Sequence, residues 1–411
     1  MTSASRFCGA PLRTTFVDLG VQPLANSYLT ADQVAAGCEA RYPLHARVCT
    51  QCWLVQVDDV VPAEAIFDAN YAYFSSYSRT WVEHAGRFAQ SIAERLKLGT
   101  ESLVVEVASN DGYLLQHFVA MGIPVLGIEP TANTAEAARA RGVRTEVMFF
   151  TDVSAAALAR QFARADLVVA NNVLAHVPDI GGFVAGFRHV LAEEGVLSFE
   201  FPHLLNLIQN VQFDTIYHEH FSYLSLLSVE QILRSKGLRP FDVEVLATHG
   251  GSVRLWCAHA RSGHQETKAL ATLRADESAA GLGRPETYAG FTPRVDAVRR
   301  SFRDYLADSL AARRRVAAYG AAAKGNTFLN YCGVSTNEIM AVFDANPAKQ
   351  GRYLPGTHIP IHAPEHLSVI RPDDVVILPW NLAEEITGQL ASVRAWGGRF
   401  VVANPLTRVL A

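Results

Sequence analysis

The sequence has no run of about 18 apolar residues, the length that a membrane-spanning helix needs. Its first residues, MTSASRFCGAPLR, lack an apolar signal core, so we expect a cytoplasmic protein. An excess of charge of one sign is also missing, because 36 basic and 40 acidic side chains leave a formal net charge of −4. Without a basic surface, we expect neither nucleic acid nor a membrane as partner, and a small-molecule substrate is expected instead.

Cysteine is scarce, and its distribution excludes a disulfide scaffold. Six cysteines occur in 411 residues, and four of them lie within the first 52. Cys49 and Cys52 form a C-x-x-C motif whose spacing lets two thiolates bind one tetrahedral zinc ion. A redox role for this motif is disfavoured because no thioredoxin-like strand and helix surround it.

The second half of a zinc knuckle is incomplete in this sequence. Cys8 supplies a third thiolate, but Ser5 stands where a zinc ribbon normally has another cysteine. Water, Cys38 and His45 remain open as the fourth ligand. Two alternatives also stay open, namely a degraded site without zinc and cysteines that only pack in a small apolar core.

The length and composition predict two or three packed domains, since 49% of the 411 residues are apolar and 18% are charged. Beyond residue 70, strand-like runs such as LVVEV, VLGIEP and GVLSFEFP alternate with helical stretches. This alternation predicts an α/β fold with a doubly wound, mostly parallel, Rossmann-like sheet. The run FDVEVLATHGGSVRLWCAHA resembles a hairpin and would add an antiparallel end strand.

The turn after the first strand of this sheet indicates the cofactor. It follows Glu106, carries Asn110 and Gly112, and lacks the G-x-G-x-x-G pattern of a dinucleotide site. Glu106 would repel a pyrophosphate but would attract the amino group of S-adenosylmethionine (SAM). Glu129 closes the second strand and is placed to bind both hydroxyls of a ribose. We therefore predict a methyltransferase domain.

Motifs along nearly the whole chain resemble, in order, those of sugar C-methyltransferases of the dTDP-hexose C-3 type. They are CTQC, YAYFSSYS, EVASNDG, GIEP, NNVLAHV, FDTIYHEHFSYLS, HGGSVR, YGAAAKGN and FDANPAKQGRYLPGTHIPI. The resemblance implies a small zinc-binding domain at 1–68, a SAM-dependent methyltransferase domain at 69–262 and a Rossmann-like domain at 263–411 that contributes to nucleotide-sugar binding. The chain departs from the family at Ser5 and at Ala108, where glycine is usual, and we expect one extra methyl group to be tolerated.

The stretch YHEHFSY, residues 217–223, gathers groups that handle protons. Methylation of a carbon needs a carbanion equivalent, which a 4-keto sugar supplies at C-3 next to its carbonyl. A histidine can remove that proton, an acidic neighbour can orient its ring, and a phenol can stabilise the enolate oxygen. The resemblance implies these catalytic residues: His220 as the base, with Tyr217, Glu219, Tyr71 and His176.

Structural roles remain open for several of these residues. The YHEHFSY stretch also fits a polar surface loop, His176 fits a strand-end position, and Tyr71 fits aromatic packing. His218 is left out of the site because of the resemblance alone.

The resemblance also implies which residues bind the two ligands. For the cofactor they are Glu106, Ala108, Ser109, Asn110, Gly112, Glu129, Phe149, Phe150 and Asn172. For a dTDP-linked sugar they are Ser75, Ser78, Lys324, Asn326 and His358. The two phenylalanines also suit the core, with one of them covering the adenine. A monomer is expected.

The C-terminal part repeats the strand–turn–helix pattern in RRRVAAYGAAAKGNTFLNYCG. Its turn lacks the glycine spacing of an NAD site, and Lys324 favours an anion such as a nucleotide diphosphate at a helix N-terminus. A purely structural role, in which this domain only supports the catalytic one, stays open as an alternative. Two other classes of function therefore remain as alternatives: an NAD-dependent oxidoreductase that uses this domain, and a zinc-ribbon interaction protein with α/β scaffolds.

Overall fold

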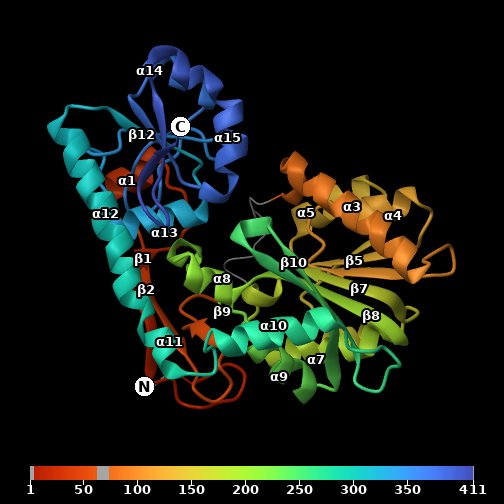
Figure 1. The fold of residues 1–411 in the computed structure, drawn as a ribbon. Coiled ribbons are helices and arrows are strands. Elements are labelled where there is room, and N and C mark those ends of the chain that lie inside the picture. Colours follow the sequence, from red (N-terminus) through yellow and green to blue (C-terminus); the bar gives the residue numbers. More distant parts are fainter. Residues whose placement is uncertain (1–3, 63–73, 411) are drawn as a thin grey trace.

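The computed structural model describes residues 4–62 and 74–410, which contain three β-sheets. Figure 1 shows a four-stranded sheet near the N-terminus (red), a seven-stranded sheet to its right and a six-stranded sheet (blue) above it. The long helix α12 (Phe291–Ala311) runs along both the red and the blue units. No helix in these ranges is long and apolar enough to cross a membrane.

The first sheet is antiparallel, and a strand from far along the chain completes it. Its order is β1 (Thr14–Pro23), β2 (Arg41–Val48), β3 (Val55–Val57) and β9 (Ser222–Tyr223). In the last pair, Val55 lies opposite Tyr223 and Gln56 opposite Ser222. Because β9 forms the end of YHEHFSY, the last two residues of that stretch are part of the N-terminal sheet. The short helix α1 (Ala31–Ala36) connects β1 to β2.

The middle sheet has the predicted alternation of strands and helices. Its order is β10-β11-β8-β7-β4-β5-β6, and the neighbours from β8 to β6 are parallel. The strands are β4 (Val104–Val107), β5 (Val125–Glu129), β6 (Thr145–Val147), β7 (Ala165–Asn171), β8 (Leu191–Pro202), β10 (Leu238–Leu246) and β11 (Ser252–His259). The antiparallel strand is β11, which lies between β8 and the edge strand β10.

Helices cover both faces of the middle sheet, as buried parallel strands require. One face carries α3 (Arg79–Leu96), α4 (Leu115–Ala120) and α5 (Ala132–Ala140). The other carries α6 (Asp152–Leu158), α7 (Ile180–Val190), α9 (Leu226–Ser235) and α10 (Lys268–Ala279). The carboxyl ends of the parallel strands point toward the other two units, so ligand-binding turns face the centre of the molecule (Figure 1).

The C-terminal unit is a second doubly wound sheet, as predicted. Its order is β14-β13-β12-β15-β16-β17, and only β17 is antiparallel to its neighbour. The strands are β12 (Val316–Tyr319), β13 (Val342–Phe343), β14 (Ile361–His362), β15 (Asp374–Ile377), β16 (Arg399–Val402) and β17 (Arg408–Leu410). The helices are α13 (Ala323–Cys332), α14 (Leu367–Ile370) and α15 (Ala383–Gln389), preceded by α11 (Pro285–Ala289) and α12.

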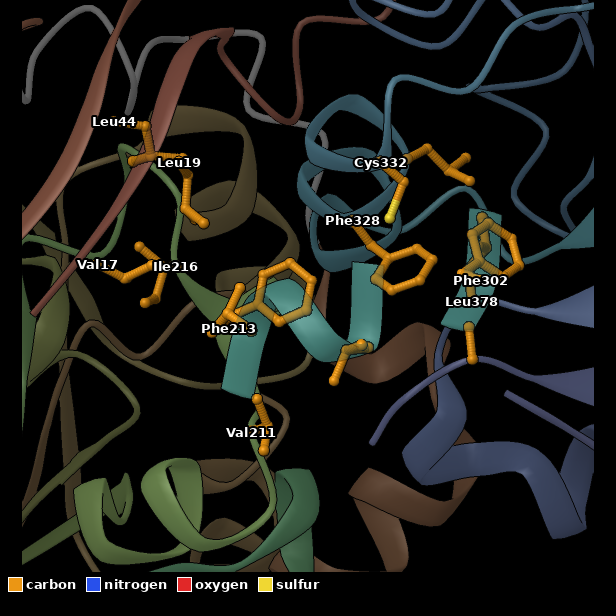
Figure 2. Close-up of a cluster of buried hydrophobic side chains, with 14 of the residues drawn as sticks. Val17, Leu19, Leu44, Val211, Phe213, Ile216, Phe302, Phe328, Cys332 and Leu378 are labelled. Atoms are coloured by element: carbon orange, nitrogen blue, oxygen red, sulfur yellow. The ribbon is translucent and has the colours of Figure 1, made fainter. Parts of the chain in front are cut away.

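One apolar cluster joins the N-terminal sheet, the C-terminal unit and the segment before YHEHFSY. It includes Val17, Phe213, Ile216 and Phe328, which Figure 2 shows together. Phe213 is fully buried, and its ring centroid lies 5.8 Å from that of Phe328 and 5.3 Å from that of Tyr331. This ring therefore fixes the chain just before YHEHFSY to helix α13.

The turn after β4 adopts left-handed backbone at three positions. The φ angle is 58° at Ala108, 49° at Asn110 and 77° at Gly112. Glycine and asparagine adopt this conformation readily, whereas the Cβ of alanine approaches the following carbonyl oxygen. The expectation that Ala108 adds only a methyl group was therefore incomplete. Alanine here also has to adopt a left-handed backbone conformation, which costs free energy.

We predict that Phe213→Ala destabilises the protein by about 3–5 kcal/mol, the usual cost of deleting a buried phenylalanine ring. Differential scanning calorimetry should show a fall of the unfolding midpoint, and hydrogen exchange should show faster exchange across residues 213–223. The control is Phe400→Ala, which removes an equally buried ring from the separate C-terminal cluster. It should lower the midpoint without accelerating exchange in that segment. An unchanged midpoint for Phe213→Ala would contradict the proposed anchoring.

We predict that Ala108→Gly stabilises the protein by about 0.5–1 kcal/mol, because relief of left-handed strain exceeds the added entropy of the unfolded chain. Ala137→Gly, within helix α5, should instead destabilise it by about 1 kcal/mol. Denaturant unfolding of both variants measures the difference. Equal destabilisation by the two substitutions would rule out strain at Ala108.

Candidate functional site

Both ring nitrogens of His220 have a hydrogen-bond partner, and the partners indicate the tautomer of the neutral ring. Its Nδ1 lies 2.9 Å from the carbonyl oxygen of Thr215, and its Nε2 lies 2.8 Å from the hydroxyl of Tyr217. A carbonyl oxygen can only accept, so Nδ1 carries the hydrogen and Nε2 accepts from the phenol. The expectation that an acidic neighbour orients this ring was wrong, because the backbone of Thr215 does so.

Burial is the main reason that His220 is neutral. Burial lowers the pKa of His220 well below its usual value, and the nearby His176, Lys324 and His249 lower it further, against the hydrogen bond to Thr215. The rings of His176 and His220 are 4.6 Å apart at 74°. Burial also lowers the pKa of His176 to about 4, although a hydrogen bond to the backbone of Glu219 opposes this shift. At neutral pH, two uncharged imidazoles therefore meet edge to face.

Glu219 faces the N-terminal segment. Both of its carboxylate oxygens accept from the amide of Asn26, at 2.8 and 2.9 Å. Burial raises the pKa of Glu219 to about 7, although the Asn26 hydrogen bond opposes the rise. His218 faces away from His220, with its Nε2 3.2 Å from the carbonyl of Pro43. The structure thus separates the two histidines of HEH.

Lys324 brings a cation from the C-terminal unit to this site. Its ammonium donates to Asn381 at 2.7 Å and lies 4.8 Å from the ring centroid of Trp380. Burial lowers the pKa of Lys324, and the negative charge of Asp214 opposes this shift. The indole of Trp380 donates to Asp214 at 2.6 Å, so the ring under Lys324 is fixed to the segment before YHEHFSY.

The remaining predicted sugar-binding residues do not all gather at Lys324. Asn326 donates to the carbonyl of Ala25 at 2.6 Å, and His358 lies 3.4 Å from Glu39, so both contact the N-terminal unit. The amide of Ser75 donates to Asn110 of the cofactor turn at 2.9 Å. The hydroxyl of Ser78 caps helix α3. Tyr71 lies outside the described residues.

His249 is a site residue that the sequence reasoning missed. It has φ of 53°, its ring lies 5.0 Å from that of Trp81, and burial followed by the charge of Lys324 lowers its pKa to about 4. A Cβ on the next residue, Gly250, would lie 2.4 Å from the ring of Trp380. The motif HGG was a usable signal, because two glycines beside a histidine indicate close backbone approach. The HGG turn brings the middle sheet against the C-terminal unit.

The carboxyl ends of β4 and β5 form the candidate cofactor site. Glu106 is fully buried, and burial raises its pKa well above the usual range, although the phenol of Tyr113 opposes this. Glu129 accepts from the amides of Asn110 at 2.8 Å and Thr131 at 3.0 Å. The hydroxyl of Thr131 also donates to Glu129, at 2.5 Å. A carboxylate accepts about four hydrogen bonds, so about one position of Glu129 remains for a ribose hydroxyl. A cationic ligand with a ribose fits this donor and acceptor set.

The other predicted cofactor residues surround the same strand ends. Ser109 is buried, and a Cβ on Gly127 of β5 would lie 2.6 Å from its Oγ. Asn172 follows β7 with φ of 52°. Phe150 packs in the core, where its ring contacts those of neighbouring phenylalanines on α7, whereas Phe149 is 40% exposed. Of these two rings, only Phe149 is open to a ligand.

Three thiols of the N-terminal unit converge as predicted. The Sγ atoms of Cys8, Cys49 and Cys52 lie within 4.8 Å of one another, which suits the soft-ligand preference of zinc. Cys38 is exposed and donates to the carbonyl of Ala36, and His45 lies beside Thr15, so neither joins this group. The donor set fits a structural Zn²⁺ ion.

Comparison with known proteins gives matches in all three units. Residues 6–67 match a family described as "Putative zinc binding domain", residues 81–242 a methyltransferase domain, and residues 247–405 a C-methyltransferase C-terminal domain. C-methyltransferase NovU of Streptomyces niveus is 37% identical over 405 residues, which cover 98% of this chain and 96% of that protein.

More distant matches cover a smaller share of the chain. A ubiquinone biosynthesis O-methyltransferase of Rhodopseudomonas palustris (strain BisA53) is 23% identical over 33% of this chain and 62% of its own length. Among solved structures, magnesium protoporphyrin IX methyltransferase (ChlM) of Synechocystis PCC 6803 with bound SAH is 16% identical, with a TM-score of 0.34, over 44% of this chain and 84% of that chain.

The three family matches follow one another along the chain, and the similarity to NovU extends over nearly its whole length. This chain therefore belongs to the family of three-domain, SAM-dependent C-methyltransferases.

Proposed function

We propose that this enzyme methylates C-3 of a 4-keto, nucleotide-linked deoxysugar. The observation that carries the proposal is the neutral His220, whose Nε2 accepts from Tyr217 while Nδ1 donates to Thr215. A histidine can remove a proton next to a carbonyl only when its ring is unprotonated before the reaction. The similarity to NovU, a C-methyltransferase, supports carbon as the methyl acceptor.

His220 and Tyr217 divide the proton chemistry between them. When the sugar carbonyl replaces His220 as the partner of the Tyr217 hydroxyl, the lone pair of Nε2 becomes free. The C-3 proton then passes to Nε2, and the C–H electron pair moves into the enolate, whose oxygen accepts from Tyr217. SAM, when bound, supplies the electrophilic methyl group. Thr215 holds the imidazolium ring in position throughout.

Lys324 links the binding of the substrate to the basicity of His220. Its charge is one cause of the lowered pKa of His220. A nucleotide diphosphate beside Lys324 would neutralise that charge and so raise the pKa of His220 toward neutrality. The anionic substrate would thereby strengthen the base that acts on it.

We assign the domain boundaries 1–68, 69–262 and 263–411 to the zinc, methyl-transfer and nucleotide-sugar roles.

The contacts of the C-terminal turn argue against the NAD alternative. The carbonyl of Ala321, in the turn after β12, accepts from the hydroxyl of Tyr28 at 2.5 Å and from Lys349 at 2.8 Å. Asp344, at the end of β13, accepts from the amide of Ala321 at 2.7 Å. Tyr28 and Lys349 thus contact the turn at Ala321, where a dinucleotide would place its pyrophosphate, whereas Lys324 faces Asn381 and Trp380.

We predict that His220→Asn lowers kcat by about 10²- to 10⁴-fold while leaving SAM affinity unchanged, because the ring acts on the sugar. Mass spectrometry of reactions with a panel of 4-keto nucleotide sugars measures turnover, and calorimetry measures SAM binding. With the demethylated cofactor bound, the wild type should exchange the C-3 hydrogen with deuterated water, and the variant should not. Tyr217→Phe should lose about 10²-fold in turnover.

The matched control is His218→Asn, which changes the other histidine of HEH and should keep most of the activity. Since the base must be neutral and its pKa lies below 6.5, kcat/KM should stay level as pH falls from 7 to 6.5 and should decline only at lower pH. Near-normal turnover of His220→Asn would remove this residue as the base, with the methyltransferase assignment intact.

We predict that Glu129→Ala weakens SAM binding by about 2–4 kcal/mol, since it removes the ribose acceptor and leaves hydroxyls unpaired. Isothermal titration calorimetry measures the change, and circular dichroism confirms that the variant is folded. Glu136→Ala, an exposed change on helix α5, is the control and should bind SAM normally. Undiminished affinity in the Glu129 variant would refute its role.

A further inference from the structure

Two turns of the N-terminal unit have the same backbone hydrogen bonds, and their comparison shows which position Ser5 occupies. In the turn at 49–54, the amide of Cys49 donates to Leu54 at 3.0 Å, and the amide of Trp53 donates back to Cys49 at 2.8 Å. In the turn at 5–10, the corresponding distances are 2.8 Å from Ser5 to Ala10 and 2.9 Å from Gly9 to Ser5.

The correspondence extends to the conformation of the turns and to their side chains. Trp53 and Gly9 occupy the same place and have φ of 60° and 72°. Two residues past Cys49, the amide of Gln51 donates to the Cys49 Sγ at 3.4 Å. In the other turn, Ser5 Oγ also accepts from an amide, that of Cys8 three residues on, at 3.4 Å. Ser5 therefore occupies the position that Cys49 has in its own turn.

The interatomic distances agree with a fourth ligand position. Ser5 is 4% exposed, and its Oγ lies 3.4 Å from Cys52 Sγ, while Cys8 Sγ lies 3.5 Å from Cys49 Sγ. With Zn–S of about 2.3 Å and Zn–O of about 2.0 Å, a tetrahedral ion separates an oxygen and a sulfur ligand by about 3.5 Å and two sulfurs by about 3.8 Å. Both measured distances are thus close to the spacing of two ligands on one zinc ion.

We propose that the hydroxyl of Ser5 is the fourth ligand of a Cys₃Ser zinc site. The hydroxyl coordinates as a neutral group, so the site carries one negative charge less than a four-cysteine site. The side-chain amide of Gln56 donates to Ser5 Oγ at 3.4 Å and so orients the hydroxyl. A neutral oxygen binds soft Zn²⁺ less strongly than a thiolate does, so this site should release zinc more readily.

The site also supports the segment that carries His220. Gln56 lies on β3 opposite Ser222 of β9, and its side-chain oxygen accepts from the amide of Arg6 at 2.8 Å. Arg6 donates to the carbonyl of Pro178 at 2.9 Å, and its guanidinium lies 5.2 Å from the ring centroid of Phe221. Metal bound beside Ser5 therefore holds the strand against which YHEHFSY pairs.

The test measures metal affinity and spectra, and does not depend on the sugar substrate. Zinc affinities of the purified wild type, Ser5→Cys and Ser5→Ala are determined by competition with a chromophoric chelator. We expect Ser5→Cys to bind zinc at least about tenfold more tightly and Ser5→Ala at least about tenfold more weakly than the wild type. The control Cys38→Ser should bind like the wild type. Cobalt-substituted Ser5→Cys should gain the charge-transfer absorption of an additional thiolate.

Three results would overturn the proposal. Wild-type protein with less than about a tenth of an equivalent of zinc, and no affinity for added zinc, would show a degraded site. Equal affinity of Ser5→Ala and the wild type would give the fourth position to water. A Ser5→Cys variant without tighter binding or added thiolate absorption would show that Ser5 is not at a ligand position. If Ser5→Ala fails to fold, the cobalt spectra of the wild type and Ser5→Cys still show whether residue 5 is at a ligand position.

Discussion

The segment from Phe213 to Tyr223 is anchored at both ends by units other than the methyltransferase sheet that surrounds it in sequence. At its start, Phe213 packs against α13 of the C-terminal unit, and at its end β9 pairs with β3 of the N-terminal sheet. His220 and Tyr217 lie between these two anchors. A candidate base on a loop needs such support, because misplacement by about 1 Å can cost about 10²-fold in rate.

Charge is the second constraint on this site. Three histidines and Lys324 approach one another in a region where burial disfavours their charged forms. The neutral histidines avoid repulsion only while no proton is added. An anionic ligand would be the natural complement, since it would offset the charge of Lys324 and that of a protonated His220. The cofactor site has the opposite character, with Glu106 and Glu129 buried at adjacent strand ends and suited to a cation.

The sequence predicted features that depend on local pattern. The strands and turns around Glu106 and Glu129, the second Rossmann-like sheet and the convergence of Cys8 with the C-x-x-C pair all follow from spacing or motif. It did not predict that Thr215 orients His220, because a backbone carbonyl has no residue-type signal. Nor did it predict the pairing of Glu219 with Asn26, since these residues are 193 positions apart.

Other differences have similar physical origins. The left-handed φ of Ala108 is a property of the backbone that composition does not reveal, and the same holds for His249. Asn326 was assigned to the sugar from a motif, but its amide binds the carbonyl of Ala25 across the unit boundary. Motifs identify which residues gather at a turn, whereas tertiary contacts decide what each side chain binds.

The position of β9 has a consequence for biosynthesis. During translation, β3 leaves the ribosome more than 160 residues before the strand that pairs with it, so its edge stays open while the middle sheet is made. The apolar face of β1 stays uncovered for longer still, because the helices that pack against it, α12 and α13, follow residue 290. The packing of the N-terminal unit is therefore complete only after the C-terminal unit has been synthesised, and until then that edge and face are exposed to non-native contacts.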